Sequence, residues 1–394
     1  MKPTLAVFFG GASVEHEISV ISAVQAMRSV NRAKYELIPV YITKEGDFYT
    51  GEKLLDISAY KDLPGLLSAC TKIYIIREDG AVSAYPTVTG RFKKREPVAK
   101  LDFAFPVVHG TNCEDGTLQG FFELLGLPYA GCDILASAVG MDKAIFKNVM
   151  QCADIPVLPC VSFYSKKWVS QREELTRRIE EEIGFPLIVK PANLGSSVGI
   201  SKVDSKEQLS QAVTLAMSFA NKLLVERAVS PLREINCAVL GDTDECDASE
   251  CEEPVMSGGI LSYTDKYMSK GGESKGMSGL SRKLPADITA EKRAEIRDIA
   301  CRAFQAAGCC GVARIDFLMD EADGGQIYVN EINTLPGSLS FYLWEAAGLK
   351  YPELIDRLVE LGFKRARTKG NLMFTFDTNI LKDMGALGAK GGKR

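Results

Sequence analysis

Two strand-like stretches decide the fold of this chain: Ala313-Arg314-Ile315-Asp316-Phe317 and Tyr328-Val329-Asn330-Glu331-Ile332-Asn333-Thr334. Successive side chains of a strand alternate between its faces, so Glu331 and Asn333 point the same way. Asp316 and Glu331 are embedded in apolar runs, where a charge is costly unless it is paired or bound to a metal. Carboxylate and amide oxygens suit Mg²⁺, which also keeps water and phosphate ligands. We therefore expect a metal site at Asp316, Glu331 and Asn333, although ordinary acids at strand ends would give the same pattern.

The composition indicates an enzyme with several domains. The 394 residues, of which 46% are hydrophobic, are enough for two or three cores. The net charge of −4 gives no basic field, so we expect no nucleic-acid partner. No apolar run has the length of a membrane helix, and the first residues are strand-like. We therefore expect a cytoplasmic protein that does not associate with membranes.

The eleven cysteines are scattered, and most have apolar neighbours. That distribution is typical of reduced thiols in cores. The only histidines are His16 and His109, and no CxxC pair accompanies them. We therefore expect no structural zinc site.

Strand-like runs alternate with helical patterns, which predicts an α/β protein with α+β parts. Residues 1–131 are expected to form a doubly wound unit, with strands at 5–9, 36–42, 72–77 and 102–108. After the first strand, Ser13 is predicted to cap a helix. Residues 132–225 are predicted to form a second unit, with a helix running through Met141-Asp142-Lys143 and a strand at 185–191.

Residues 226–365 are predicted to form a third unit that ends in a helix from Pro352 to Gly362. The tail 366–394 follows, and its Gly- and Lys-rich end is expected to be disordered. Two further segments have mobile-looking compositions: 242–254, which is rich in acids, and 269–281, which is rich in Gly, Ser and Lys.

The turn Gly195-Ser196-Ser197-Val198-Gly199 follows a strand, and its small residues allow backbone N–H groups to approach phosphate oxygens. Lys190 at the end of that strand can add a positive charge. A plain β-turn explains the turn equally well, because neither the Walker A nor the GxGxxG spacing is present.

Six motifs occur in a characteristic order along the chain. They are Gly10-Gly11-Ala12-Ser13-Val14-Glu15-His16-Glu17-Ile18-Ser19, Phe105-Pro106-Val107-Val108-His109-Gly110, Glu114-Asp115-Gly116-Thr117-Leu118-Gln119-Gly120, Met141-Asp142-Lys143, Val189-Lys190-Pro191 with the Gly/Ser turn, and the two stretches quoted first. From residue 5 to residue 362 the chain thereby resembles the D-alanine–D-alanine ligases of the ATP-grasp superfamily. The resemblance implies an ATP-grasp fold with an N-terminal doubly wound, Rossmann-like domain, and the substrates ATP and D-alanine. It leaves a homodimer open.

The resemblance implies roles on the nucleotide side. Lys143 and Lys190 would contact the phosphates and adenine of ATP, and Lys266 the γ-phosphate. Glu226 and Glu234 would hold the adenine amino group and the ribose, although Glu226 alone could be an ordinary acid at a strand end. Asp316, Glu331 and Asn333 would bind two Mg²⁺ (or Mn²⁺) ions.

On the substrate side, the resemblance implies that Glu15 receives the ammonium of the first D-alanine and is linked through Ser196 to Tyr267. His109 would lie near the first carboxylate, and Arg314 would stabilise the transferred phosphate. A helix-dipole acid at Glu15, a core histidine and a structural arginine are the alternatives. Residues 263–267 match the family's mobile loop, whose closure keeps water from the intermediate.

One departure concerns the second substrate. The segment after Pro336-Gly337 is shorter than in the family, and the serine that binds the second carboxylate there has no clear counterpart. Ser338 or Ser340 could replace it, with Arg314 and the Gly337 backbone.

The resemblance predicts the ATP-dependent joining of two D-alanine molecules through a D-alanyl phosphate, for peptidoglycan precursor synthesis. Two alternatives remain: another acceptor, such as D-lactate, D-serine or another D-amino acid, or a catalytically impaired nucleotide-binding homologue. Tyr267 favours an amine acceptor over D-lactate, because relatives that make the depsipeptide carry another residue there.

Overall fold

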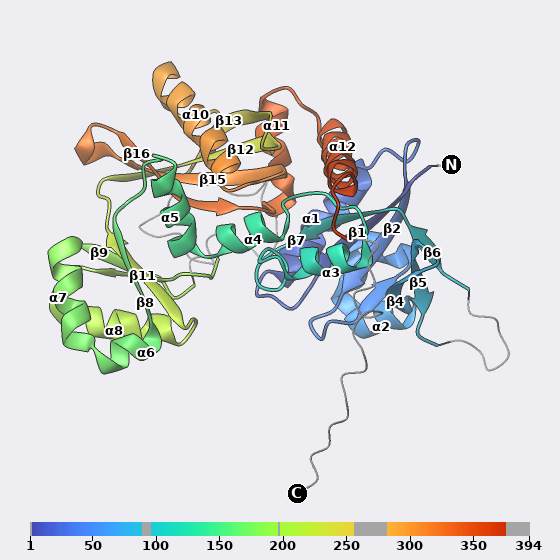
Figure 1. The fold of residues 1–394 in the computed structure, drawn as a ribbon, viewed down its shortest axis with the longest axis horizontal. Helices are drawn as coiled ribbons and strands as arrows, with labels where there is room; N and C mark the ends of the chain where they lie inside the picture. The colour runs from blue at the N-terminus through green and yellow to red at the C-terminus, as the bar shows by residue number, and fades with distance from the viewer. Residues whose placement is uncertain (1, 89–95, 196–197, 256–281, 376–394) are drawn as a thin grey trace, which may run out of the picture.

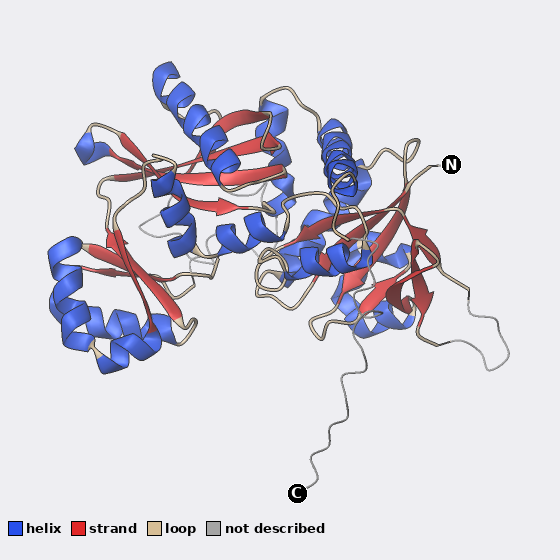
Figure 2. Ribbon diagram, in the orientation of Figure 1, coloured by secondary structure: helices blue, strands red, loops and turns tan. Residues whose placement is uncertain are grey.

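The computed structural model describes residues 2–88, 96–195, 198–255 and 282–375 (Figure 1). The strands form three sheets, of seven, four and five strands (Figure 2). One sheet lies in each of the three predicted regions, except that the last strand of the second sheet runs two residues past the predicted boundary at 225. The mixture of helices and sheets confirms the predicted fold class.

The N-terminal sheet has the order β6-β5-β4-β3-β2-β1-β7. Its strands are β1 (Thr4–Gly10), β2 (Glu36–Ile42), β3 (Phe48–Thr50), β4 (Thr71–Glu78), β5 (Ala81–Pro86), β6 (Ala99–Leu101) and β7 (Phe103–Val108). Strands β2, β1 and β7 are parallel, and an antiparallel series from β3 to β6 extends them. Both faces of β1 are buried, so this strand reads as an unbroken apolar run.

Helix α1 (His16–Ser29) follows β1, but Ser13 does not cap it as predicted. The Ser13 hydroxyl instead donates to the carbonyl of His109 at 2.7 Å, and Glu15 takes the N-cap position. The start of α1 is thereby tied to the end of β7. Helices α2 (Leu63–Ser68) and α3 (Thr117–Leu125) and the 3₁₀ turns η1 (Glu52–Leu55) and η2 (Ile57–Asp62) complete this region.

The predicted helix through Met141-Asp142-Lys143 is two helices, α4 (Ile134–Met141) and α5 (Lys143–Cys152). The break occurs because the Asp142 side chain accepts hydrogen bonds from the N–H groups of Ala144 and Ile145, as an N-cap does. Lys143 therefore starts a helix.

The central sheet has the antiparallel order β10-β9-β11-β8. Its elements are β8 (Cys160–Tyr164), α6 (Ser165–Ser170), α7 (Arg172–Glu182), β9 (Leu187–Pro191), β10 (Ser201–Val203), α8 (Lys206–Met217) and β11 (Lys222–Arg227). Figure 1 shows α6, α7 and α8 together on one side of this sheet. The opposite side is left to face the rest of the molecule.

The C-terminal sheet has the antiparallel order β14-β13-β12-β15-β16. Its strands are β12 (Leu232–Gly241), β13 (Cys246–Pro254), β14 (Arg282–Lys283), β15 (Gly311–Asp320) and β16 (Gln326–Asn333), and η4 (Glu321–Asp323) joins the last two. Helix α10 (Ala290–Ala306) packs its buried residues on this sheet. The acidic segment 242–254, predicted to be mobile, is mostly the ordered strand β13, because its acids are paired: Glu253 with Arg233 and Glu252 with Arg282.

The turn η5 (Gly337–Ser340) and helices α11 (Phe341–Ala346) and α12 (Tyr351–Gly370) close the described fold. Helix α12 does not end at Gly362 as predicted. A Cβ at Gly362 would lie 2.5 Å from the Phe103 ring, so the glycine allows α12 to pass close to the N-terminal sheet. Arg365 then donates to the carbonyl of Tyr129 at 2.8 Å. The last helix therefore ties the C-terminal region to the first.

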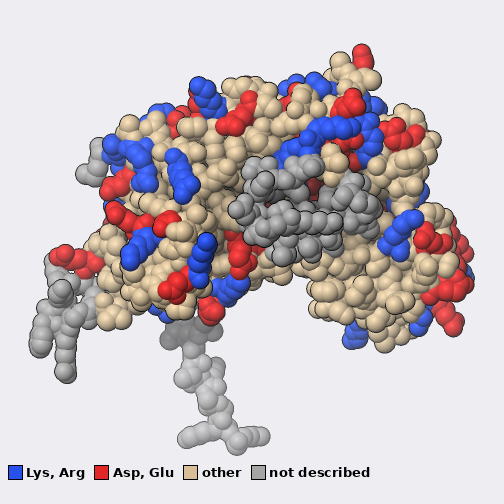
Figure 3. Space-filling view, turned by 180° about the vertical axis from the view of Figure 1, so that it is seen from behind, with Lys and Arg blue, Asp and Glu red and all other residues tan. Residues whose placement is uncertain are grey.

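Acidic and basic side chains are interspersed over the face drawn in Figure 3. Among the described helices, none is both long and apolar enough to cross a membrane.

Candidate active site

A cleft lies between the central and C-terminal sheets. Residues from both sheets line it: Lys143, Ile188, Lys190, Leu194, Gly195, Ile200, Lys202, Glu226, Arg227, Ala228, Val229, Ser230, Leu232, Glu234, Asp316, Phe317, Leu318, Asn330 and Glu331. The lining combines apolar walls with lysines and acids. An apolar ring with a phosphate tail would match such a lining.

The floor of this cleft holds a buried carboxylate with two lysines. Glu226 pairs with Lys147 and, at 2.5 Å, with Lys190. Burial alone raises the pKa of Glu226, but the two lysines outweigh it and lower that pKa to about 2. Lys190 also donates to Asn330 on β16 at 3.0 Å. The ionised Glu226 therefore fixes Lys190 where the two sheets meet.

The predicted metal ligands come together on β15 and β16. Asp316 is directly opposite Glu331 in the strand register, and the Asn333 amide donates to Asp316 at 3.1 Å. Arg314 grips Asp316 with Nε and Nη2, at 2.6 and 2.7 Å. Lys143 contacts Glu331 at 3.1 Å and donates to the carbonyl of Leu194. Each acid of the set therefore has a cation beside it.

A second, smaller pocket continues from these acids toward the N-terminal domain. It is lined by Glu15, Gly110, Glu114, Gly140, Met141, Lys143, Leu194, Gly195, Glu331, Ile332, Asn333 and Thr334. The Glu15 carboxylate reaches it from the start of α1. An added Cβ would lie 3.2 Å from that carboxylate at Gly110 and 3.6 Å from it at Gly195. Glycine at position 110 lets the carboxylate approach closely, and the distance at Gly195 is an ordinary contact that places Glu15 beside Gly195.

Residues 4–132 match the family described as D-ala D-ala ligase N-terminus, and residues 149–360 match D-ala D-ala ligase C-terminus. The chain belongs to the D-alanine–D-alanine ligase family. This makes it an ADP-forming ligase, and the enzyme class expected from the sequence is confirmed. The family uses ATP and a divalent cation.

Individual relatives cover nearly all of the chain. The D-alanine--D-alanine ligase of Thermosipho melanesiensis is 39% identical over 96% of this chain and 98% of its own length. The ligase of Caldicellulosiruptor bescii is 40% identical over 95% of this chain and 99% of its own. Two solved structures are similar: the Coxiella burnetii D-alanine-D-alanine ligase (TM-score 0.77, 30% identity, 94% and 96% covered) and the VanG D-Ala:D-Ser ligase of Enterococcus faecalis (TM-score 0.76, 33% identity, 92% and 100% covered).

Two residues predicted to bind substrate in this ligase are engaged with α1. His109 is buried, its Nδ1 lies 3.1 Å from the carbonyl of Leu335, and its Nε2 lies 3.3 Å from the Ser22 hydroxyl. Burial lowers the pKa of His109, so its ring is neutral at pH 7. Ser338 donates to the Gln25 side chain at 3.0 Å and is 2% exposed. In this structure both side chains hold η5 against α1.

The shortened segment of the ligase has an unusual backbone. Ser338, Leu339 and Ser340 have φ values of 50°, 57° and 50°, in the left-handed region that favours glycine. All three are buried, and the Ser340 hydroxyl has no hydrogen-bond partner among the described residues. The turn follows Gly337 and leads straight into α11.

Glu114 is a residue of the candidate site for which the sequence predicted no role. It lines the Glu15 pocket and accepts a hydrogen bond from the N–H of Gly110 at 2.7 Å. Burial and the nearby charge of Glu15 raise the pKa of Glu114 to about 8. The position of Glu114 in one of the six motifs was the sequence signal that could have identified it.

Three predicted residues, Ser196, Lys266 and Tyr267, lie outside the described residues, as do segment 269–281 and the end of the tail. Their roles remain predictions. Glu234 lines the cleft between the central and C-terminal sheets, and its role also remains a prediction.

Proposed function

We propose that this ligase joins two D-alanine molecules into D-alanyl-D-alanine through a D-alanyl phosphate, and that ATP occupies the cleft between the central and C-terminal sheets. The main support is the pairing of Asp316 with Glu331 across β15 and β16, between the lysine-lined cleft and the Glu15 pocket. That position is where a phosphoryl group would pass from nucleotide to substrate.

On this assignment, a carboxylate oxygen of the first D-alanine attacks the γ-phosphorus, and ADP leaves. The amine of the second D-alanine then attacks the carbonyl carbon, the bond from that carbon to the phosphate oxygen breaks, and the amine loses a proton. Glu15 holds the first ammonium group. Lys143 and Lys190 hold the ATP phosphates as point charges, and Arg314 binds the transferring phosphate with its planar fork.

The donor set fits a hard cation. Asp316, Glu331 and Asn333 offer only oxygen donors for it, with two carboxylates among them. Among the described residues no group of three or more His, Cys, Asp or Glu side chains could hold a metal alone, so ATP phosphates and water would complete the shell. We assign these residues to two Mg²⁺ (or Mn²⁺) ions, which neutralise phosphate charge when bound.

A second candidate acceptor is D-serine. The VanG structure, which is that of a D-Ala:D-Ser ligase, matches this chain about as well as the Coxiella burnetii enzyme does. A catalytically impaired homologue is disfavoured, because the residues proposed to bind the phosphates, the metal ions and the first ammonium group are all present in the sequence.

The test is ADP release by the purified protein with Mg-ATP and D-alanine, alone or with D-serine or D-lactate, and with mass analysis of the products. We expect D-alanyl-D-alanine as the main product at pH 7. If a mixed dipeptide with D-serine predominates, the acceptor is D-serine and not D-alanine. ADP release without any peptide or depsipeptide would overturn the ligase assignment.

A further inference from the structure

A row of polar side chains crosses the C-terminal sheet. The strand register places Glu252 opposite Asn236, Asn236 opposite Asp316, and Asp316 opposite Glu331. Side chains opposite one another on neighbouring strands share a face, so all four lie on the face that carries the proposed metal ligands. Glu252 is two strands from Asp316, which corresponds to roughly 10 Å at the usual strand spacing.

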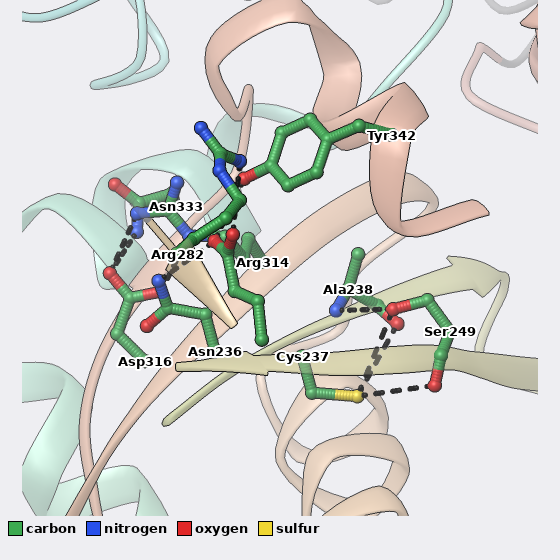
Figure 4. Close-up of polar contacts among 10 residues, drawn as sticks. Asn236, Cys237, Ala238, Ser249, Arg282, Arg314, Asp316, Asn333 and Tyr342 are labelled. Carbon is green, nitrogen blue, oxygen red and sulfur yellow. Dashed lines mark hydrogen bonds and ion pairs between the residues drawn. The ribbon is translucent and has the colours of Figure 1, made fainter. Parts of the chain in front are cut away.

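The far end of this row carries a second arginine. Arg282 donates from Nη1 to Glu252 at 3.0 Å, and the Asn236 amide and the Tyr342 hydroxyl donate to the other oxygen of Glu252 at 3.1 and 2.8 Å. The guanidinium carbon of Arg282 is 4.1 Å from the centre of the Tyr342 ring. Figure 4 shows Arg282 and Tyr342 beside Arg314, with Asp316 and Asn333 next to them.

This arginine is held in place but not fully bonded. Its side chain is 13% exposed, and Nη2 is buried with no hydrogen-bond partner among the described residues. A buried donor of a cation without a partner is unfavourable, and a guanidinium fork matches a carboxylate best. The position therefore suits a ligand carboxylate.

The shortened segment places Tyr342 here. Ser338 is hydrogen-bonded to α1, and Ser340 is fully buried. The hydroxyl group of this segment that lies beside the arginines therefore belongs to Tyr342 on α11. That hydroxyl is itself bonded to Glu252. The acceptor carboxylate thus needs a donor other than a serine.

We propose that Arg282 binds the carboxylate of the acceptor amino acid, with Tyr342 and Glu252 positioning its guanidinium, and that Arg314 lies on the other side of the bound acceptor. This inference rests on the proposed function. It makes Arg282 a residue that selects acceptors bearing a carboxylate.

The test uses the full chain with Mg-ATP, D-alanine and D-alaninamide in one reaction. D-alaninamide has the acceptor amine but no carboxylate, so the ratio of D-alanyl-D-alanine to D-alanyl-D-alaninamide reports carboxylate recognition. The ratio does not depend on how much of a variant is folded. Hydroxylamine trapping of D-alanine hydroxamate reports formation of the acyl phosphate separately.

We expect Arg282→Ala to lower the product ratio by roughly ten- to a hundredfold, because a hydrogen bond to a charged group is lost. Trapping of the hydroxamate should stay within about twofold of the unmodified protein, since the first step does not involve the acceptor. Arg282→Lys should give an intermediate ratio, because it keeps the charge and loses the fork. This variant also serves if Arg282→Ala fails to fold.

Arg233→Ala is the matched control. Arg233 pairs with Glu253, the next residue along β13, whose side chain points to the opposite face. The ratio should not change in this variant. A ratio unchanged by both Arg282 variants would overturn the inference while leaving the ligase assignment intact. Absence of hydroxamate and of both products with the unmodified protein would instead overturn the proposed function, and this inference with it.

Discussion

The proposed nucleotide side and the proposed acceptor side of this ligase differ in how the sequence marks them. On the nucleotide side, Glu226 is buried between Lys147 and Lys190; Lys190 lies in a motif, and the family resemblance named Glu226. On the acceptor side, Glu252, Arg282 and Tyr342 come from β13, β14 and α11, and none belongs to a motif. Both sets are assembled from three segments that lie far apart in the sequence, so spacing along the chain is a signal for neither. Lys190 was recognised because the residues around it match a family motif, and no such match marks the acceptor side.

The largest effect should come from the acid at the centre of the nucleotide side. Glu331→Gln replaces a charged oxygen ligand with a weaker neutral one and leaves Lys143 without its carboxylate. We expect ligation to fall by at least about a thousandfold with an unchanged unfolding midpoint. The measurement is ADP release together with thermal unfolding.

Glu321→Gln is the control for that variant. Glu321 lies in the turn between β15 and β16, is 40% exposed and pairs with Arg233. Near-normal ligation by Glu331→Gln would remove the metal assignment.

Removal of the buried acid Glu226 should lower the free energy of unfolding. Glu226→Gln keeps the shape but leaves two ammonium groups buried without their anion. We expect a loss of about 3–5 kcal/mol in the free energy of unfolding by urea. Glu180→Gln, which breaks the exposed pair with Lys206, should change it by less than about 1 kcal/mol. Equal losses in the two variants would contradict the contrast between buried and exposed pairs.

Arg314 lies between the two sides and tests whether they share a residue. Arg314→Lys keeps the charge but cannot grip Asp316 with two parallel bonds. We expect ligation to fall by about a hundredfold, with trapping of the hydroxamate reduced as well. Full activity would indicate a structural arginine.

The smallest effect concerns pH and the Glu15 pocket. Because the pKa of Glu114 is raised to about 8 in the folded protein, the folded state keeps a proton that the unfolded state releases near its ordinary value of 4.5. The stability from this group is complete below that value and is lost as pH rises toward 8. Between pH 6 and pH 8, without nucleotide or divalent cation, the unmodified protein should lose about 2 kcal/mol more than Glu114→Gln. If urea titrations show the same loss of unfolding free energy for both proteins between pH 6 and pH 8, Glu114 is already ionised at pH 6.

The family, the α/β class and the strand pair that brings Asp316 and Glu331 together were all within reach of the sequence. The alternation of side chains along a strand and the order of motifs along the chain can both be read directly from the sequence. The tertiary structure alone decided the rest. It extended α12 past Gly362 and ordered the acids of β13, which have the composition of a loop. The helix break at Asp142, by contrast, is local, because the Asp142 side chain caps α5.

The physical reason is the same for α12 and β13, because partners distant in sequence overrode local preference. Glu252 and Glu253 form a buried strand because Arg282 and Arg233 neutralise them, and a glycine lies inside α12 because a side chain at position 362 would clash with the Phe103 ring. The sequence by itself determined the chemistry that this ligase family shares. Only the fold decided which side chains lie at the proposed acceptor site.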